Sequence, residues 1–284
     1  MIHHMQNVKN GTPDFKLRFY EVMKYPLPLN KGYFLYREGL KNTLEEDSNA
    51  SNFSREEKNQ YMDTYLKFIK RRWFLYKSFP FVREIYLANS ISFNALTKNS
   101  DIDIFVVTQD WRVRTSRLFM SIMMAMIWIK RRKGTERKKF CLSFFVEKSN
   151  SNLEKIWLWE KDIYLPYWIA HLVPLYIEKT PTIYKTNNWI KKILPNVKEE
   201  QMIFLWNKVY KWKTRFKKIM EFLLRRSFWE TIEAIIQIAR GRRIRKIIKL
   251  NPEIHEGVIV NKSMLKFHLD KRNYYSELFF QADN

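Results

Sequence analysis

The sequence has few of the residues from which disulfide bonds and zinc sites are built. Its 284 residues include one cysteine, Cys141, and five histidines that lie too far apart to form a zinc-binding signature. A single cysteine excludes an internal disulfide bond and fits a reducing compartment. The polar residues at the start predict no signal peptide. We therefore expect a cytoplasmic protein.

Long hydrophobic runs are also absent. The longest covers residues 118–129 (LFMSIMMAMIWI), whereas a membrane-spanning helix needs about 20 apolar residues. We expect no membrane span and interpret this run as a buried helix.

Acidic side chains are greatly outnumbered, because 52 lysines and arginines stand against 29 aspartates and glutamates and give a formal net charge of +23. Such a surplus favours polyanionic partners, such as nucleic acid, nucleotides or an anionic membrane surface. The alternative is that the abundance of Lys, Ile and Asn reflects the base composition of the genome. Composition alone leaves polyanion binding open.

The basic residues form clusters at 130–134 (KRRKG), 136–140 (ERKKF), 208–218 and 240–249. In the last two clusters a helix would place cations such as Lys211, Arg215 and Lys218 on one face and apolar residues on the other. Such faces are either simply solvated or track phosphates and bring RNA or another polyanionic acceptor to a site.

Hydrophobic periodicity predicts an α+β fold. A capping-box pattern at Ser54 and Glu57 precedes apolar residues at helical spacing, which predicts an amphipathic helix over residues 55–78 that packs on a sheet. Residues 80–150 then have the pattern strand, short helix, strand, long helix, strand. We expect an N-terminal helical segment at 1–78, a core with a small mixed sheet and flanking helices at 79–150, and a basic, aromatic-rich helical domain at 151–284.

Two aspartates stand at the start of an apolar run in residues 100–107 (SDIDIFVV). In a strand, residues i and i+2 point to the same side, so Asp101 and Asp103 project next to each other. Two carboxylates this close repel each other unless a cation lies between them. A strand edge exposed to water is the simple explanation for such a pair, and a site for Mg²⁺ with substrate phosphates is the functional one.

The functional explanation gains weight from the preceding residues. Asn89 and Ser90 form a small-residue turn after an apolar strand, and ten residues separate Ser90 from Asp101. Backbone N–H groups and the hydroxyl of such a turn can hold phosphate oxygens. In-line phosphoryl or nucleotidyl transfer needs both parts, metal ions and a phosphate cradle.

This turn and the Asp-x-Asp strand resemble the signature of the DNA polymerase β-type nucleotidyltransferase superfamily. The similarity extends, over residues 80–275, to a poorly characterised group of bacterial nucleotidyltransferase-domain proteins. It is carried in order by FVREIYLANSISF, SDIDIFVV, RTSRLF, KKFCLSFFVE, YLPYWIAHLVPLY, WIKKILPN and MLKFHLDKR. The resemblance implies that Asp101 and Asp103 bind two Mg²⁺ ions, that Asn89 and Ser90 bind phosphate, and that an NTP donates a nucleoside monophosphate to an acceptor hydroxyl.

The sequence departs from this superfamily in two ways. Asn89 stands where glycine is usual, although Asn tolerates a left-handed backbone better than most residues. A third carboxylate is usual on a neighbouring strand, but the corresponding positions in residues 140–147 hold Cys141 and Ser143. Glu147 would share their face, about 13 Å beyond Ser143 at ~3.3 Å per residue. Other candidates for the third acid are Asp162 and Asp270.

The missing acid supports an alternative function. The chain would then be a catalytically weak or inactive module with a nucleotidyltransferase fold that binds RNA or nucleotide. His268 also has two interpretations, a structural residue or an acid–base or substrate contact with Asp270, and sequence alone does not choose between them.

Overall fold

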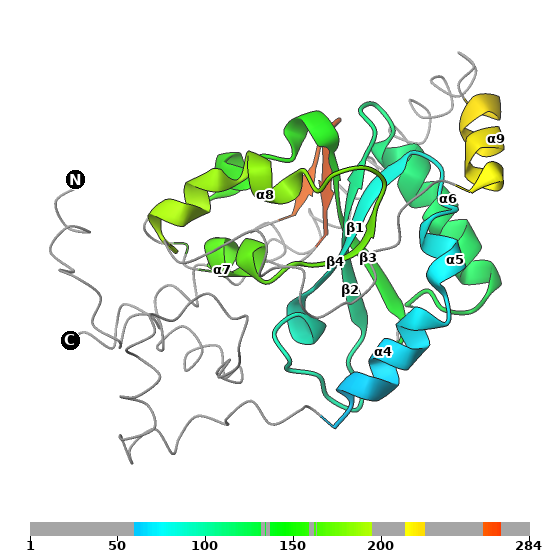
Figure 1. Cartoon of the computed structure of the whole chain (residues 1–284), viewed down its shortest axis with the longest axis horizontal. Coiled ribbons are helices and arrows are strands. Elements are labelled where there is room, and N and C mark those ends of the chain that lie inside the picture. The colour runs from blue at the N-terminus through cyan, green and yellow to red at the C-terminus, as the bar shows by residue number, and fades with distance from the viewer. Residues whose placement is uncertain are drawn as a thin grey trace, which may run out of the picture.

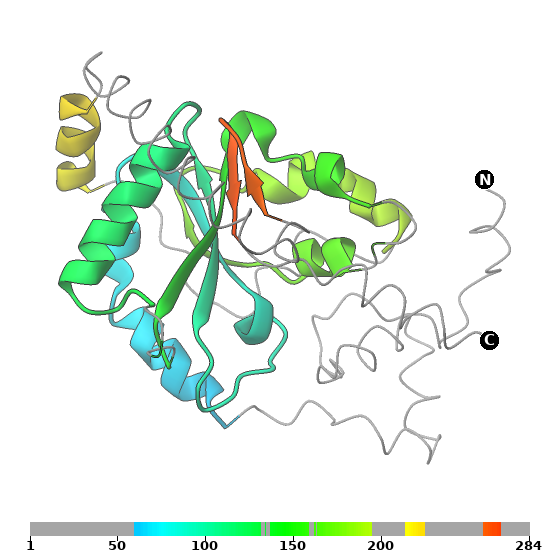
Figure 2. The same cartoon turned by 180° about the vertical axis from the view of Figure 1, so that it is seen from behind.

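The computed structural model describes residues 60–131, 134, 137–158, 162, 164–194, 214–224 and 258–267, and all structural statements concern these residues. They form a six-stranded mixed sheet with helices on both faces (Figures 1 and 2). The mixed α+β class expected from the sequence is therefore confirmed.

The sheet has the strand order β4-β1-β2-β3-β6-β5. Its strands are β1 (Val82–Ala88), β2 (Ile102–Thr108), β3 (Phe140–Glu147), β4 (Val173–Ile177), β5 (Ile259–Val260) and β6 (Met264–Lys266). Strands β2 and β3 are parallel, and the other neighbouring pairs are antiparallel. The parallel pair requires a crossover, which the helix α6 (Val113–Met126) provides.

Each face of the sheet has its own hydrophobic core because the side chains of a strand alternate between faces. On one face Ile102, Ile104 and Val106 of β2 pack with α4 (Met62–Lys70), α5 (Trp73–Tyr76) and α6. On the other face Phe105 and Val107 pack with α7 (Tyr164–Ala170), α8 (Ile183–Thr186) and the short helix η6 (Asn188–Lys192). The central strand β2 is consequently buried along its whole length.

The predicted order of elements in the core is confirmed. Strand β1 is followed by the short helix η2 (Asn89–Ile91), and then by β2, α6 and β3. Two further short helices, η3 (Lys148–Asn150) and η4 (Leu153–Ile156), follow β3.

The amphipathic helix predicted over residues 55–78 is two helices in the structure. Helix α4 ends at Lys70, and α5 begins at Trp73. Side chains cap the end of α4: the Tyr76 hydroxyl donates a hydrogen bond to the carbonyl of Ile69, and Arg72 donates one to the carbonyl of Phe68. The capping box at Ser54 and Glu57 lies outside the described residues.

The helical pattern expected after residue 151 is wrong for three segments. Residues 173–177, 259–260 and 264–266 are strands β4, β5 and β6, and β4 and β6 pair with the core strands β1 and β3. Short apolar runs do not distinguish strands from buried helix segments, and a strand this short is defined by its pairing. One sheet thus includes strands from residues 79–150 and from residues 151–284.

Helix α9 (Arg215–Leu223) also differs from expectation, because its apolar side chains do not face the core. Phe216, Ile219, Phe222 and Leu223 are exposed. Lys217 is fully buried, and its ammonium group donates hydrogen bonds to the Val82 carbonyl and, at 3.1 Å, to the Tyr176 hydroxyl. Polar contacts, rather than an apolar stripe, therefore hold this helix against the sheet.

The run at residues 118–129 lies mainly in α6, as the sequence predicted, but it is not buried throughout. Met120 and Met124 are buried, whereas Ile122, Met126 and Trp128 are exposed. None of the described helices has the length and hydropathy that crossing a bilayer would require.

We predict that His171, at the end of α7, makes the protein less stable at acidic pH. Its ring is 4.6 Å from that of Phe93, and its Nδ1 donates to the Tyr167 carbonyl at 2.7 Å. Burial lowers the pKa of His171 from 6.5 to about 4, so the unfolded chain takes up a proton at a higher pH than the folded protein does. This contribution is present in full above pH ~6.5 and is lost as the pH falls towards ~4, with a loss of about 2 kcal/mol at pH ~5.

Urea unfolding of the wild type and of His171→Gln between pH ~7 and pH ~5 measures this effect. The variant should lose less stability than the wild type over that range, whatever its stability at neutral pH. Equal losses in the two proteins would show that His171 is not the titrating group.

Candidate functional site

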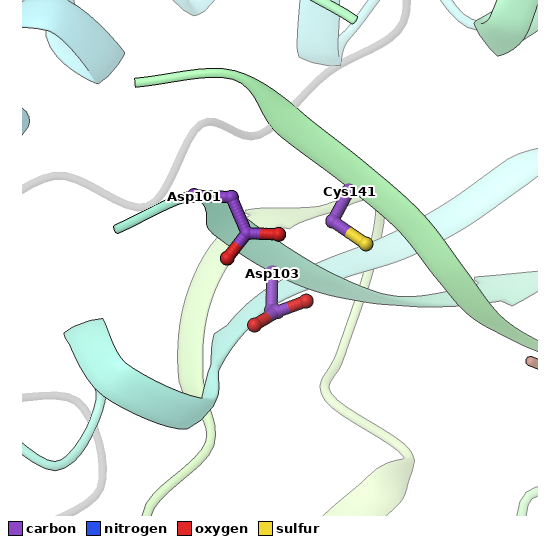
Figure 3. A group of neighbouring side chains, drawn as sticks. All are labelled: Asp101, Asp103 and Cys141. Atoms are coloured by element: carbon purple, nitrogen blue, oxygen red, sulfur yellow. The ribbon is translucent and has the colours of Figure 1, made fainter. Parts of the chain in front are cut away.

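Two acids and the single cysteine come together at one end of the sheet. Asp103 lies on β2 between Ala88 of β1 and Cys141 of β3, and Asp101 immediately precedes β2. One potential ligand atom from each of Asp101, Asp103 and Cys141 lies within 4.8 Å of the others (Figure 3). The two aspartates thus lie together, as the strand spacing in the sequence predicted. The pairing of β3 with β2 places Cys141 beside them.

Arg131 supplies a positive charge to this cluster. Its guanidinium group lies 2.8 Å from an Asp101 carboxylate oxygen and 3.6 Å from the sulfur of Cys141. A cation in this position reduces the repulsion between the two carboxylates. In the sequence Arg131 is one of the basic residues at 130–134, and that charge cluster alone does not predict its contact with Asp101.

Burial sets the protonation behaviour of Asp103, which is 7% exposed. Removal from water raises its pKa above the ordinary range, because the charged form loses hydration. Hydrogen bonds with the side chains of Asn89 and Cys141 and the charge of Arg131 oppose this rise. Neighbouring polar groups therefore compensate in part for the burial of this carboxylate.

Cys141 is a protonated thiol at neutral pH. Burial, followed by the charge of Asp103, raises the pKa of the thiol to about 12. A protonated sulfur carries no charge and can donate a hydrogen bond, but it cannot serve as a base. At the strand position where the resemblance leads us to expect a third carboxylate, Cys141 therefore offers neither a negative charge nor a base.

The turn at Asn89 and Ser90 lies directly beside Asp103, because it follows Ala88 and Ala88 pairs with Asp103. Asn89 has a left-handed backbone with φ 55°, the conformation for which glycine is usual. Its side-chain oxygen accepts a hydrogen bond from Trp168 Nε1 at 2.8 Å. Asn89 thereby links helix α7 to the end of the sheet that carries the aspartates.

Glu147 does not share the face of Cys141, contrary to the alternation expected from the sequence. Asp103 pairs with Cys141 and Phe105 with Phe144, so β3 has one residue more than β2 between these pairs. This β-bulge reverses the side to which the following residues point. The carboxylate of Glu147 accepts a hydrogen bond from the Trp111 backbone N–H at 2.8 Å, beside the start of α6.

The other candidates for the third acid have different positions. Asp162 is buried and accepts a hydrogen bond from the Leu165 backbone N–H at 3.0 Å, in the first turn of α7. Asp270 and His268 lie outside the described residues, as does Lys211. Among the described residues, the group of metal-ligating side chains consists of Asp101, Asp103 and Cys141.

We predict that Asn89→Ala destabilises the protein more than Asn89→Gly. Both substitutions remove the hydrogen bonds to Trp168 and Asp103, but only alanine carries the steric cost of a left-handed backbone. The difference should be about 1 kcal/mol. Chemical denaturation measures it, and equal stabilities for the two variants would contradict a strained backbone at this position.

The chain has no counterpart among the proteins with which it was compared. Protein-family models, curated proteins and solved structures all give no match. Its function must therefore be inferred from its own residues: an aspartate pair at the end of a buried strand, a left-handed turn beside it, and a cysteine and an arginine in contact with the aspartates.

Proposed function

We propose that the chain is a metal-dependent nucleotidyltransferase that transfers a nucleoside monophosphate from an NTP to an acceptor hydroxyl. The observation that carries this proposal is the position of Asp101 and Asp103 at the start of β2, next to the Asn89 turn. In this reaction the acceptor oxygen forms a bond to the α-phosphorus while the bond from that phosphorus to the bridging oxygen breaks. Pyrophosphate leaves, and the hydroxyl proton is released to solvent.

The residues present fit a hard divalent cation in part. Two carboxylates that project together are typical of Mg²⁺ sites, where substrate phosphates and water complete the coordination. A neutral thiol is a poor ligand for such an ion, so Asp101 and Asp103 would hold it and Cys141 would not. Bound Mg²⁺ would neutralise the phosphate charge and orient the α-phosphorus for in-line attack.

The remaining roles belong to groups of the chain itself. The first N–H groups of a helical turn have no acceptor within the turn, so those at the start of η2 can hold the β- and γ-phosphates together with the Ser90 hydroxyl. Arg131 pairs with Asp101 in the structure. If a metal ion takes over this carboxylate, the guanidinium is available to a phosphate oxygen, which it binds with good geometry.

We predict that Mg²⁺ and an NTP together raise the unfolding temperature of the wild type but not that of Asp101→Asn/Asp103→Asn. A ligand present at 100 times its dissociation constant adds about 2.7 kcal/mol of stability, which gives a clear thermal shift. Asp110→Asn is the control, because it makes the same type of substitution once, just beyond the other end of β2. It should keep the full shift.

The same variants test catalysis. Loss of the aspartate pair should reduce nucleotidyl transfer by orders of magnitude, since the charge of the phosphates would no longer be neutralised. A double variant that is fully active, or that keeps the Mg²⁺-dependent shift, would rule out the proposed site.

A second candidate function is a module that binds nucleotide or RNA with weak or no catalysis. The observation in its favour is Cys141, whose neutral thiol occupies the strand position expected for the third carboxylate. Without that carboxylate, metal affinity would be low and the acceptor hydroxyl would lack a nearby base.

We predict that Cys141→Asp strengthens the response of the protein to Mg²⁺. A third carboxylate beside Asp101 and Asp103 should destabilise the metal-free protein by like-charge repulsion and stabilise the metal-bound one. The measurement is the unfolding temperature as a function of Mg²⁺ concentration, with Cys141→Asn as the uncharged control of similar size. Identical Mg²⁺ dependence in the two variants would mean that residue 141 does not face a metal site.

A further inference from the structure

A group of cations surrounds the start of β2, where the aspartate pair lies. The connection between α6 and β3 lies next to this point with two segments, residues 130–131 and residues 137–139. Five described residues of these segments form what we call the cation rim: Lys130, Arg131, Arg137, Lys138 and Lys139. All five are exposed or half-exposed. Because the rim belongs to the connection that leads into β3, its position follows from the pairing of β3 with β2.

Backbone hydrogen bonds fix the rim against the aspartates. The N–H of Lys138 donates to the Ser100 carbonyl at 3.1 Å, and the N–H of Ile102 donates to the Lys139 carbonyl at 2.8 Å. These two bonds lie on either side of Asp101 along the chain. In the segment 130–131, the Arg131 N–H donates to the Phe140 carbonyl at 3.0 Å, and the Arg131 guanidinium contacts Asp101. The rim is therefore part of the site rather than a remote surface.

The positive charges of the cation rim outnumber the negative charges of the two aspartates. Residues 130–139 contain seven lysines and arginines and one glutamate, and a bound metal ion would add positive charge. Like charges held this close repel one another unless anions bind among them. An NTP supplies phosphates for the turn at Asn89, and the surplus of the rim calls for a second polyanion.

Trp128 adds a flat apolar surface to the rim. Its side chain is 71% exposed, and its backbone is left-handed with φ 57°. The ammonium group of Lys139 donates a hydrogen bond to its carbonyl, which ties Trp128 to the rim at the point where α6 has ended. An exposed indole among cations is the combination that binds single strands, in which phosphates meet Lys or Arg and a base stacks on the ring.

We infer that the cation rim and Trp128 bind a single-stranded nucleic acid, and that this strand carries the acceptor hydroxyl. The role of the strand as acceptor rests on the proposed function, whereas strand binding is inferred from the contacts of the rim and Trp128 alone. A duplex fits less well because its base faces are covered, so Trp128 has nothing on which to stack.

The test is fluorescence anisotropy with a short labelled single strand, as RNA and as DNA, over a range of salt concentrations. Lys138→Gln/Lys139→Gln should reduce the slope of log affinity against log salt by about 1.4, since each lost phosphate contact lowers it by ~0.7. Trp128→Leu, which keeps an apolar side chain without a planar ring, should weaken binding by about tenfold, and Trp128→Phe should stay near the wild type.

Lys148→Gln/Lys179→Gln is the matched control. These exposed lysines follow the ends of β3 and β4, which run parallel to β2, so they lie at the opposite end of the sheet from Asp101. The control makes the same charge change and should keep the wild-type affinity and salt slope. Equal effects of the two double variants would overturn the inference, because binding would then reflect net charge alone.

Two further measurements separate this inference from the proposed function. Asp101→Asn/Asp103→Asn should bind the single strand at least as tightly as the wild type, because it removes negative charge beside the rim. A wild type that shows the Mg²⁺–NTP thermal shift but binds no single strand would overturn the inference and leave the proposed function intact. Binding to anionic lipid vesicles that depends on the rim lysines, without single-strand binding, would overturn it in favour of a membrane partner.

Discussion

The repulsion between two carboxylates at the end of a strand buried on both faces is the constraint on which the rest of this site depends. Asp103 is removed from water by helices on one side and by neighbouring strands in the plane of the sheet. Each surrounding group makes the pair tolerable: the amide of Asn89 and the thiol of Cys141 form hydrogen bonds with Asp103, and Arg131 brings a positive charge. A metal ion would do the same more strongly, which is why we interpret the arrangement as a site for cations and phosphates.

The two ends of the sheet differ in how their charged side chains are paired. At the end away from Asp101, Arg83 pairs with Glu178 at 2.5 Å and with Glu221 at 3.3 Å, and the buried Lys217 lies 3.8 Å from Glu178. These two bases and two acids are matched, and their contacts attach α9 to β1. At the Asp101 end, cations outnumber acids and several are exposed. Matched charges support structure, whereas a surplus at a surface attracts ligands of the opposite sign.

Much of the core could be predicted from the sequence because its signals are local. The apolar runs that became β1, β2 and β3 are long enough to identify, and the i, i+2 spacing alone places Asp101 and Asp103 together. Strands β4 and β6 were not predicted, since a run of three to five residues becomes a strand only through its partner. The bulge in β3 leaves no pattern in the sequence, so Glu147 was assigned to the wrong face. The role of Arg131 depends on its ion pair with Asp101, which joins residues 30 positions apart and cannot be predicted from hydrophobic periodicity.

The raised pKa of Cys141 has a chemical consequence of its own. Alkylating agents and peroxides react with the thiolate, and a thiol with a pKa of about 12 holds almost none of it at neutral pH. Two neighbouring carboxylates would also repel the negative charge that builds up on sulfur during such reactions. The only cysteine of this chain should therefore react slowly with oxidants and alkylating agents despite its place beside two carboxylates.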